Sequence, residues 1–318
     1  MKQLDRQRLL SITLTGAFLF VTLAPSARGG DGIPASGLHF DPELTSVRQL
    51  MKEKRYSEAM APLDEFLKRK PNSILGLIYR SKCLTDANKY REAIQDLKSA
   101  QNLDPKCAVV YRAEADIYAM MKQYDNSISA ATEAIKYSKV RPDKDIFHTR
   151  SMMYSAIGQH KKAIQDMDSY LKIDPVKPRA YSWRATACEQ DGQLDRAIGD
   201  YRIAFQKSNS YEYQFHIARI LQKQGKLKEA IEEVSKIIKQ NPDEDEAWNR
   251  RGMLYCKIGK YQEAVSDYTK ALETNFGSEE TLYRSRARAY EKLGKRDLAN
   301  KDFKKADELR KKPTVAPI

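Results

Sequence analysis

The same arrangement of apolar and polar positions recurs along most of this chain. Four segments show it plainly, and they read YREAIQDLKSAQNLDP, HKKAIQDMDSYLKIDP, LKEAIEEVSKIIKQNP and YQEAVSDYTKALETNF. Their apolar residues lie three and four positions apart, which predicts amphipathic helices and no strands. Aligned on their shared alanine, the segments indicate eight units with a spacing of 34 residues and slips of one or two. The predicted starts lie near residues 40, 74, 108, 144, 178, 211, 245 and 280.

Small residues recur at the eighth and twentieth positions of these units, and large residues recur at the fourth and eleventh. Because small residues let two antiparallel helices approach closely, we expect each unit to form a helical hairpin whose larger side chains fill the remaining space. The aromatic residues at the large positions are therefore interpreted as core residues and not as a cofactor site. The twentieth position holds Ala59, Ala93, Ser127, Ala163, Ala197, Ala230, Ala264 and Ala299.

This repeated pattern resembles the tetratricopeptide repeat, a helix-turn-helix unit of about 34 residues. The resemblance covers residues 40–312. It implies an all-α fold, a right-handed superhelical solenoid of about eight antiparallel helix pairs, and protein binding as its role. The first unit has Pro62 inside its second helix, and the eighth lacks the proline that closes several other units. Such departures are expected of end repeats, which face water on one side.

The first 27 residues have the layout of a secretory signal. Three basic residues precede an apolar stretch from Leu9 to Ala24, and small residues follow it. This stretch is shorter than the ~20 residues of a membrane span. We therefore predict a cleaved signal and an exported, periplasmic or extracellular protein without a transmembrane span; the alternative is an uncleaved signal that anchors the chain in a membrane. Residues 28–39 are predicted to be a flexible linker and residues 313–318 a short tail.

The chain carries a formal net charge of +13, so we first ask which arginines the fold itself uses. The seventh position is arginine in five units, and the twenty-third position is aspartate in the same five. In an antiparallel hairpin that turns near the fifteenth position, these two positions lie at the same height. We therefore expect five structural ion pairs, with two hydrogen bonds each where the geometry allows. The pairs are Arg80–Asp96, Arg150–Asp166, Arg184–Asp200, Arg251–Asp267 and Arg286–Asp302.

The resemblance implies that the first helix of each unit lines a concave binding surface. In the last three units this surface is rich in basic residues, and we interpret it as the site for an acidic segment of a protein partner. The alternative is a solvated basic face without a ligand. The lysine and asparagine clamp of the family's chaperone-tail receptors is absent, so that ligand is not favoured. The candidate residues are Arg219, Lys223, Asn249, Arg250, Lys257, Arg284, Arg288 and Lys292.

No pattern of catalytic, metal-binding or cofactor-binding residues appears in the sequence. The four cysteines form no CxxC motif, and the four histidines lie in different segments, so no metal site is predicted. Gly-rich phosphate-binding and nucleophile-elbow motifs are also absent. We therefore predict a non-catalytic protein-interaction scaffold that works outside the cytoplasm. The alternative is an envelope-associated or self-assembling structural protein whose basic C-terminal end contacts an anionic surface; nucleic-acid binding is not favoured.

Overall fold

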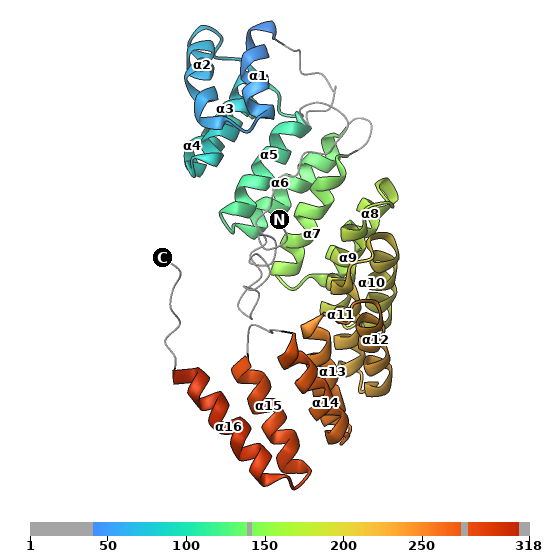
Figure 1. Ribbon diagram of the computed structural model, residues 1–318. Coiled ribbons are helices and arrows are strands. Elements are labelled where there is room, and N and C mark those ends of the chain that lie inside the picture. Colours follow the sequence, from blue (N-terminus) through green and yellow to red (C-terminus); the bar gives the residue numbers. More distant parts are fainter. Residues whose placement is uncertain (1–40, 139–141, 275–278, 312–318) are drawn as a thin grey trace. The chain divides into compact units, whose positions relative to one another are not determined.

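The computed structural model describes residues 41–138, 142–274 and 279–311, which are helical except for short turns (Figure 1). The described residues form one short 3-10 helix and sixteen α-helices, without a strand. This confirms the prediction of an all-α fold built from antiparallel helix pairs. The predicted signal, linker and tail lie outside the described residues. The chain divides into two compact units, one ending at Leu103 and the other beginning at Asp104.

The first compact unit contains the first two repeats. Its helices are η2 (Pro42–Leu44), α1 (Thr45–Lys52), α2 (Tyr56–Arg69), α3 (Ile74–Asp86) and α4 (Tyr90–Leu103). Helix α1 is short, and α2 continues through Pro62. The entry into the first repeat is held by Lys70 at the end of α2, whose Nζ atom lies 2.6 Å from Asp41 and 2.8 Å from Glu43.

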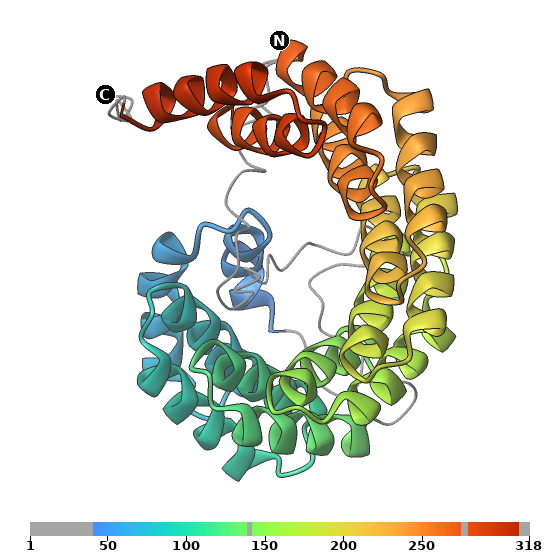
Figure 2. The ribbon, with the colours of Figure 1, turned by 90° about the horizontal axis from the view of Figure 1, so that it is seen from below.

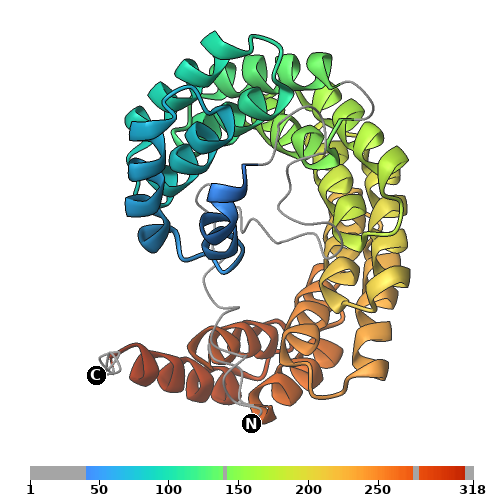
Figure 3. The same cartoon turned by 90° about the horizontal axis from the view of Figure 1, so that it is seen from above.

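The second compact unit contains the third to eighth repeats as six consecutive helix pairs. Within this unit, the pairs lie side by side in two layers (Figures 2 and 3). The helices are α5 (Ala108–Met120), α6 (Tyr124–Tyr137), α7 (Lys144–Ala156), α8 (His160–Ile173), α9 (Pro178–Gln190), α10 (Leu194–Ser208), α11 (Tyr211–Lys223), α12 (Leu227–Gln240), α13 (Asp245–Lys257), α14 (Tyr261–Glu273), α15 (Glu279–Lys292) and α16 (Arg296–Lys311).

Each hairpin turns at a residue with a positive φ angle at the fifteenth position of its repeat. This residue is glycine in the last five repeats, where the lack of a Cβ atom makes the left-handed conformation accessible without strain. The next residue donates its N–H to the carbonyl of the eleventh position, as Gln193 does to Cys188 at 2.8 Å. This is the hydrogen bond that closes a helix before a left-handed residue. The earlier repeats place Lys54, Asn88 and Lys122 in the same conformation.

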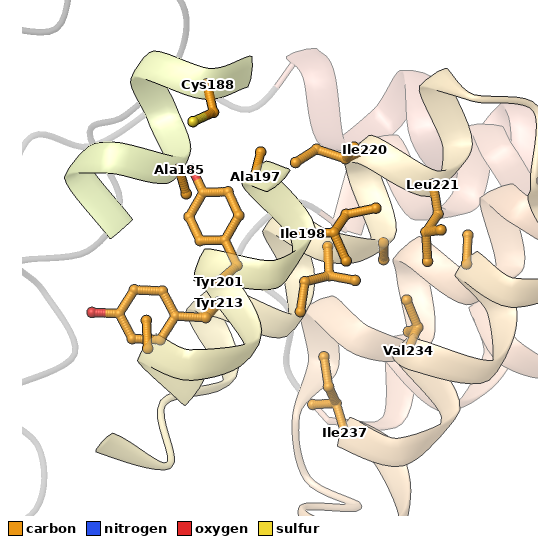
Figure 4. Close-up of a cluster of buried hydrophobic side chains, with 14 of the residues drawn as sticks. Ala185, Cys188, Ala197, Ile198, Tyr201, Tyr213, Ile220, Leu221, Val234 and Ile237 are labelled. Atoms are coloured by element: carbon orange, nitrogen blue, oxygen red, sulfur yellow. The ribbon is translucent and has the colours of Figure 1, made fainter. Parts of the chain in front are cut away.

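The core of each hairpin forms around the small residues of the repeat. Every alanine at the twentieth position is at most 1% exposed, and in the fifth and seventh repeats Tyr201 and Tyr268 belong to the same core cluster as that alanine. Figure 4 shows this arrangement in the fifth and sixth repeats, where Tyr201 lies beside Ala185 and Ala197. Where serine replaces alanine, its hydroxyl bonds to the facing backbone: Ser127 Oγ donates to the carbonyl of Ala115 at 2.8 Å.

Candidate functional site

The five arginine–aspartate pairs expected from the sequence are present in the structure. In each pair, Nε and Nη2 of the arginine donate to the two carboxylate oxygens over 2.6–2.9 Å. The aspartates are buried and the arginines are partly buried. These ten residues are therefore committed to the scaffold, and we exclude them from the search for a ligand site.

The third nitrogen of each of these arginines has a partner that the sequence analysis did not identify. Nη1 donates to a side-chain oxygen at the twenty-fifth position of the preceding repeat, over 2.7–3.2 Å. One side chain thus holds its own hairpin together and also joins it to its neighbour. The sequence contains the pattern that indicates this contact, because each of the five acceptor positions holds a residue with a side-chain oxygen. The acceptors are Asp64, Thr132, Asp168, Ser235 and Thr269.

The candidate partner-binding residues lie on the first helices of the last three repeats, as expected. We use the name first-helix face for the surface formed by the second, fifth, sixth, ninth, twelfth and thirteenth positions of α11, α13 and α15. Four of the eight candidates are engaged by carboxylates of the chain itself. Arg250 is bound by Glu246 at 2.6 Å, and Arg284 by Glu280 at 2.8 Å and by Asp307 at 3.1 Å.

The other two engaged cations share one carboxylate. Arg219 donates to both oxygens of Glu189 at 2.6 Å, and Lys223 Nζ lies 2.5 Å from Oε1 of the same residue. Burial opposes ionisation of Glu189, but the hydrogen bonds from Arg219 and Lys223 outweigh it and hold its pKa below the ordinary value. Glu189 therefore stays ionised at neutral pH. Its position on the first-helix surface follows from the repeat, but its pairing with both cations was not predicted from the sequence because it lies one repeat earlier, on α9.

A neutral histidine borders this group. Burial, together with the charge of Arg219, lowers the pKa of His216 to about 4. The His216 ring is stacked on Tyr201 with 4.7 Å between ring centroids, and its Nδ1 atom lies 3.2 Å from Nη2 of Arg219. Because the arginine can only donate, Nδ1 accepts and the ring proton resides on Nε2.

Four candidate residues have no ion partner among the residues that the structure describes. They are Asn249 and Lys257 on α13, and Arg288 and Lys292 on α15; the three cations are exposed. Met253 lies between the first two, one helical turn from each, and is 47% exposed. Helices α13 and α15 are in contact. The first-helix face of the seventh and eighth repeats therefore carries three cations without an ion partner among the described residues, together with the exposed Met253 and the exposed Glu291.

The described residues offer no arrangement for metal chemistry, since no three of their His, Cys, Asp and Glu side chains come together. The cysteines are free thiols. Burial raises the pKa of the Cys188 thiol to about 11, so this side chain is protonated and behaves as a small apolar core residue. In the part of the chain that the structure covers, no helix is both long and apolar enough to cross a bilayer.

Comparison with known proteins identifies the repeats. Three family models described as tetratricopeptide repeat match residues 154–211, 211–244 with 282–313, and 245–276. Tetratricopeptide repeat protein 16 of Mus musculus and of Homo sapiens are 23% and 24% identical to this chain over 264 residues, which is 79% of the chain. The chain spans only 31% and 28% of the length of these relatives. Hsp70-Hsp90 organizing protein 3 of Arabidopsis thaliana is 28% identical over 104 residues, 31% of this chain and 19% of that protein.

Solved structures share the fold. The C-terminal part of a repeat-containing protein from Cytophaga hutchinsonii superposes with a TM-score of 0.62 at 18% identity, covering 72% of this chain and 94% of that one. A tetratricopeptide repeat protein from Parabacteroides merdae superposes with a TM-score of 0.51 at 21% identity, covering 76% of this chain and 95% of that one. The repeat spacing, the small-residue contacts, the helix pairs and the matched segments lead to one assignment: the chain belongs to the tetratricopeptide-repeat family.

Proposed function

We propose that this protein binds an acidic segment of a protein partner on the first-helix face of its seventh and eighth repeats. Tetratricopeptide repeats imply a protein-interaction scaffold. The observation that carries the finer proposal is the set of three exposed cations, Lys257, Arg288 and Lys292, that remain after internal ion pairs are subtracted. No carboxylate among the described residues pairs with these three side chains.

Electrostatics favours a carboxylate-bearing ligand here. Arg288 and Lys292 lie four residues apart on α15, so they share a helix face and repel each other. A bound carboxylate relieves that repulsion, and guanidinium forks bind carboxylates with two hydrogen bonds. Asn249 can donate to and accept from the backbone of an extended segment. Met253 offers the apolar contact that a purely electrostatic surface lacks.

A direct test uses the full chain and a fluorescein-labelled peptide of alternating glutamate and leucine, with a lysine–leucine peptide as the ligand control. We expect binding of the acidic peptide only, weakening as salt rises, because the screening length is ~8 Å at physiological ionic strength. Arg288→Glu with Lys292→Glu should weaken it at least tenfold, which is about 1.4 kcal/mol.

The matched variant for this test carries Lys228→Glu with Lys239→Glu, two exposed cations on α12 in the other helix layer. It makes the same change in net charge, so it should bind within twofold of the wild type. Equal weakening by both double variants would show that net charge alone attracts the peptide. Unchanged binding by the α15 variant would remove the proposed site.

The exported location rests on the sequence of residues 1–27 alone. We propose that the signal is cleaved near Ala27 and that the scaffold works in a periplasmic or extracellular space. N-terminal sequencing of the protein purified from its native cells should begin within a few residues of that position. A sequence that begins at Met1 would support the membrane-anchored alternative.

The last repeat argues against end-to-end assembly through α16. Its twenty-first and twenty-eighth positions are Asn300 and Asp307, both exposed, whereas the seventh repeat has Val265 and Leu272 there, packed against α15. At these two positions α16 thus presents polar side chains where the seventh repeat packs apolar ones. We expect a molar mass independent of concentration in light scattering; mass that grows with concentration would revive the self-assembling alternative.

A further inference from the structure

The guanidinium of Arg219 has no free two-pronged edge for a ligand. Nη1 and Nη2 each donate to one oxygen of Glu189 at 2.6 Å, and Nη2 also lies 3.2 Å from Nδ1 of His216. A guanidinium offers a carboxylate two hydrogen bonds either from its two terminal nitrogens or from Nε with one of them. Glu189 occupies the first edge, and His216 shares the second.

Glu189 differs in burial from the other carboxylates on this surface. Its side chain is 9% exposed, whereas Glu246 and Glu280, which bind Arg250 and Arg284, are 42% and 36% exposed. The cations that hold it remain open to solvent, with 38% exposure for Arg219 and 53% for Lys223. The buried carboxylate thus lies beneath two accessible positive charges and uses the donors that a ligand would need.

We infer that Glu189 is an internal competitor for acidic partners, because it occupies Arg219 and Lys223 as a partner's carboxylate would. This inference rests on the proposed function and defines which repeats take part in it. The seventh and eighth repeats bind acidic groups, and the sixth is closed by a residue of the fifth. Removal of the carboxylate extends the acid-binding surface by one repeat.

The experiment measures the affinity of the full chain for the labelled glutamate–leucine peptide by fluorescence anisotropy. Glu189→Gln keeps the side-chain shape and removes the charge that holds both cations, so binding should tighten at least fivefold. The matched control is Glu212→Gln, an exposed residue on the first-helix face of α11 without an ion partner among the described residues. It removes the same charge without releasing a cation, so binding should change less than twofold.

A second variant keeps Glu189 in place. If Arg219 is already occupied, Arg219→Gln should leave binding within twofold, whereas Arg288→Gln should weaken it at least fivefold. Circular dichroism of each variant checks that the helices persist. This comparison tests the inference even if Glu189→Gln unfolds the fifth repeat.

The outcomes separate the inference from the proposed function. Tighter binding by Glu189→Gln but not by Glu212→Gln supports the inference. Equal tightening by both variants, no tightening by Glu189→Gln, or weakening by Arg219→Gln as large as that by Arg288→Gln overturns it. Absence of binding by the wild type contradicts the proposed function, and if Glu189→Gln then binds, the inference stands alone.

Discussion

The fifth and sixth repeats use different side chains at the same structural place. In the fifth repeat, Arg184 donates to Asp200 of its own hairpin and to Asp168 of the fourth repeat. In the sixth repeat, the corresponding residue is Ile217, which is 1% exposed and belongs to an apolar cluster that also contains Ile220. Figure 4 shows the part of this cluster between α10 and α12. A polar connection between repeats is thus replaced by hydrophobic packing.

The sixth repeat keeps an acidic residue at its twenty-third position, but the cations that pair with it come from other positions. Glu233 stands at the twenty-third position, and the cation comes from Arg202 at the twenty-fifth position of the preceding repeat, at 3.9 Å, and from Lys236 at 2.9 Å. The cation has therefore moved from one side of the repeat junction to the other. At this place in the repeat, the carboxylate must be paired with a cation and the space between the helices must be filled. The fifth repeat does both with an arginine, and the sixth does so with an isoleucine and a cation from the preceding repeat.

The largest loss of stability is expected from Ile217→Arg. The new guanidinium would enter an apolar cluster in which Arg202 already serves Glu233, so we expect a loss of about 4 kcal/mol in the free energy of unfolding. Urea denaturation followed by circular dichroism measures it. Adding Arg202→Ser recreates the serine acceptor that Ser235 provides for Arg251 and should recover at least about 1 kcal/mol. A loss below about 1 kcal/mol for the single variant would mean that the two junctions are interchangeable.

The helix pairs and the ion pairs within each hairpin could be predicted because both depend only on spacing within one repeat. Position seven and position twenty-three lie at the same height in any antiparallel hairpin of this length, so Arg184 and Asp200 could be paired from the sequence. Contacts between repeats depend also on how one hairpin is rotated against the next, which the spacing does not specify. That is why the link from Arg184 to Asp168, and the capture of Arg219 by Glu189, became apparent only in the structure.

A smaller loss is expected from Asp200→Ala at the polar junction. The side chain of Arg184 is 18% exposed and would lose two hydrogen bonds while keeping the one to Asp168. Removing Asp200 leaves the partly buried guanidinium with one carboxylate in place of two and with two donors unsatisfied, so we expect the free energy of unfolding to fall by about 2 kcal/mol. Asp195→Ala is the control, since that side chain is 86% exposed, and it should change stability by less than about 0.5 kcal/mol. Similar midpoints for both variants would show that the Arg184–Asp200 pair within the hairpin does not stabilise the fifth repeat.

The smallest effect is expected from Glu246→Gln. This variant tests whether the contribution of an ion pair to stability depends on its burial or on its length. Arg250 Nη2 lies 2.6 Å from Glu246, the same distance as Arg184 Nη2 from Asp200. The Glu246 side chain is 42% exposed, whereas that of Asp200 is 4% exposed, so water competes for the first pair and not for the second. We expect a change of less than about 0.5 kcal/mol in the free energy of unfolding, as for exposed pairs four residues apart on a helix. A loss as large as that of Asp200→Ala would mean that the first-helix face is covered in solution, because only exclusion of water makes an ion pair of this length costly to break.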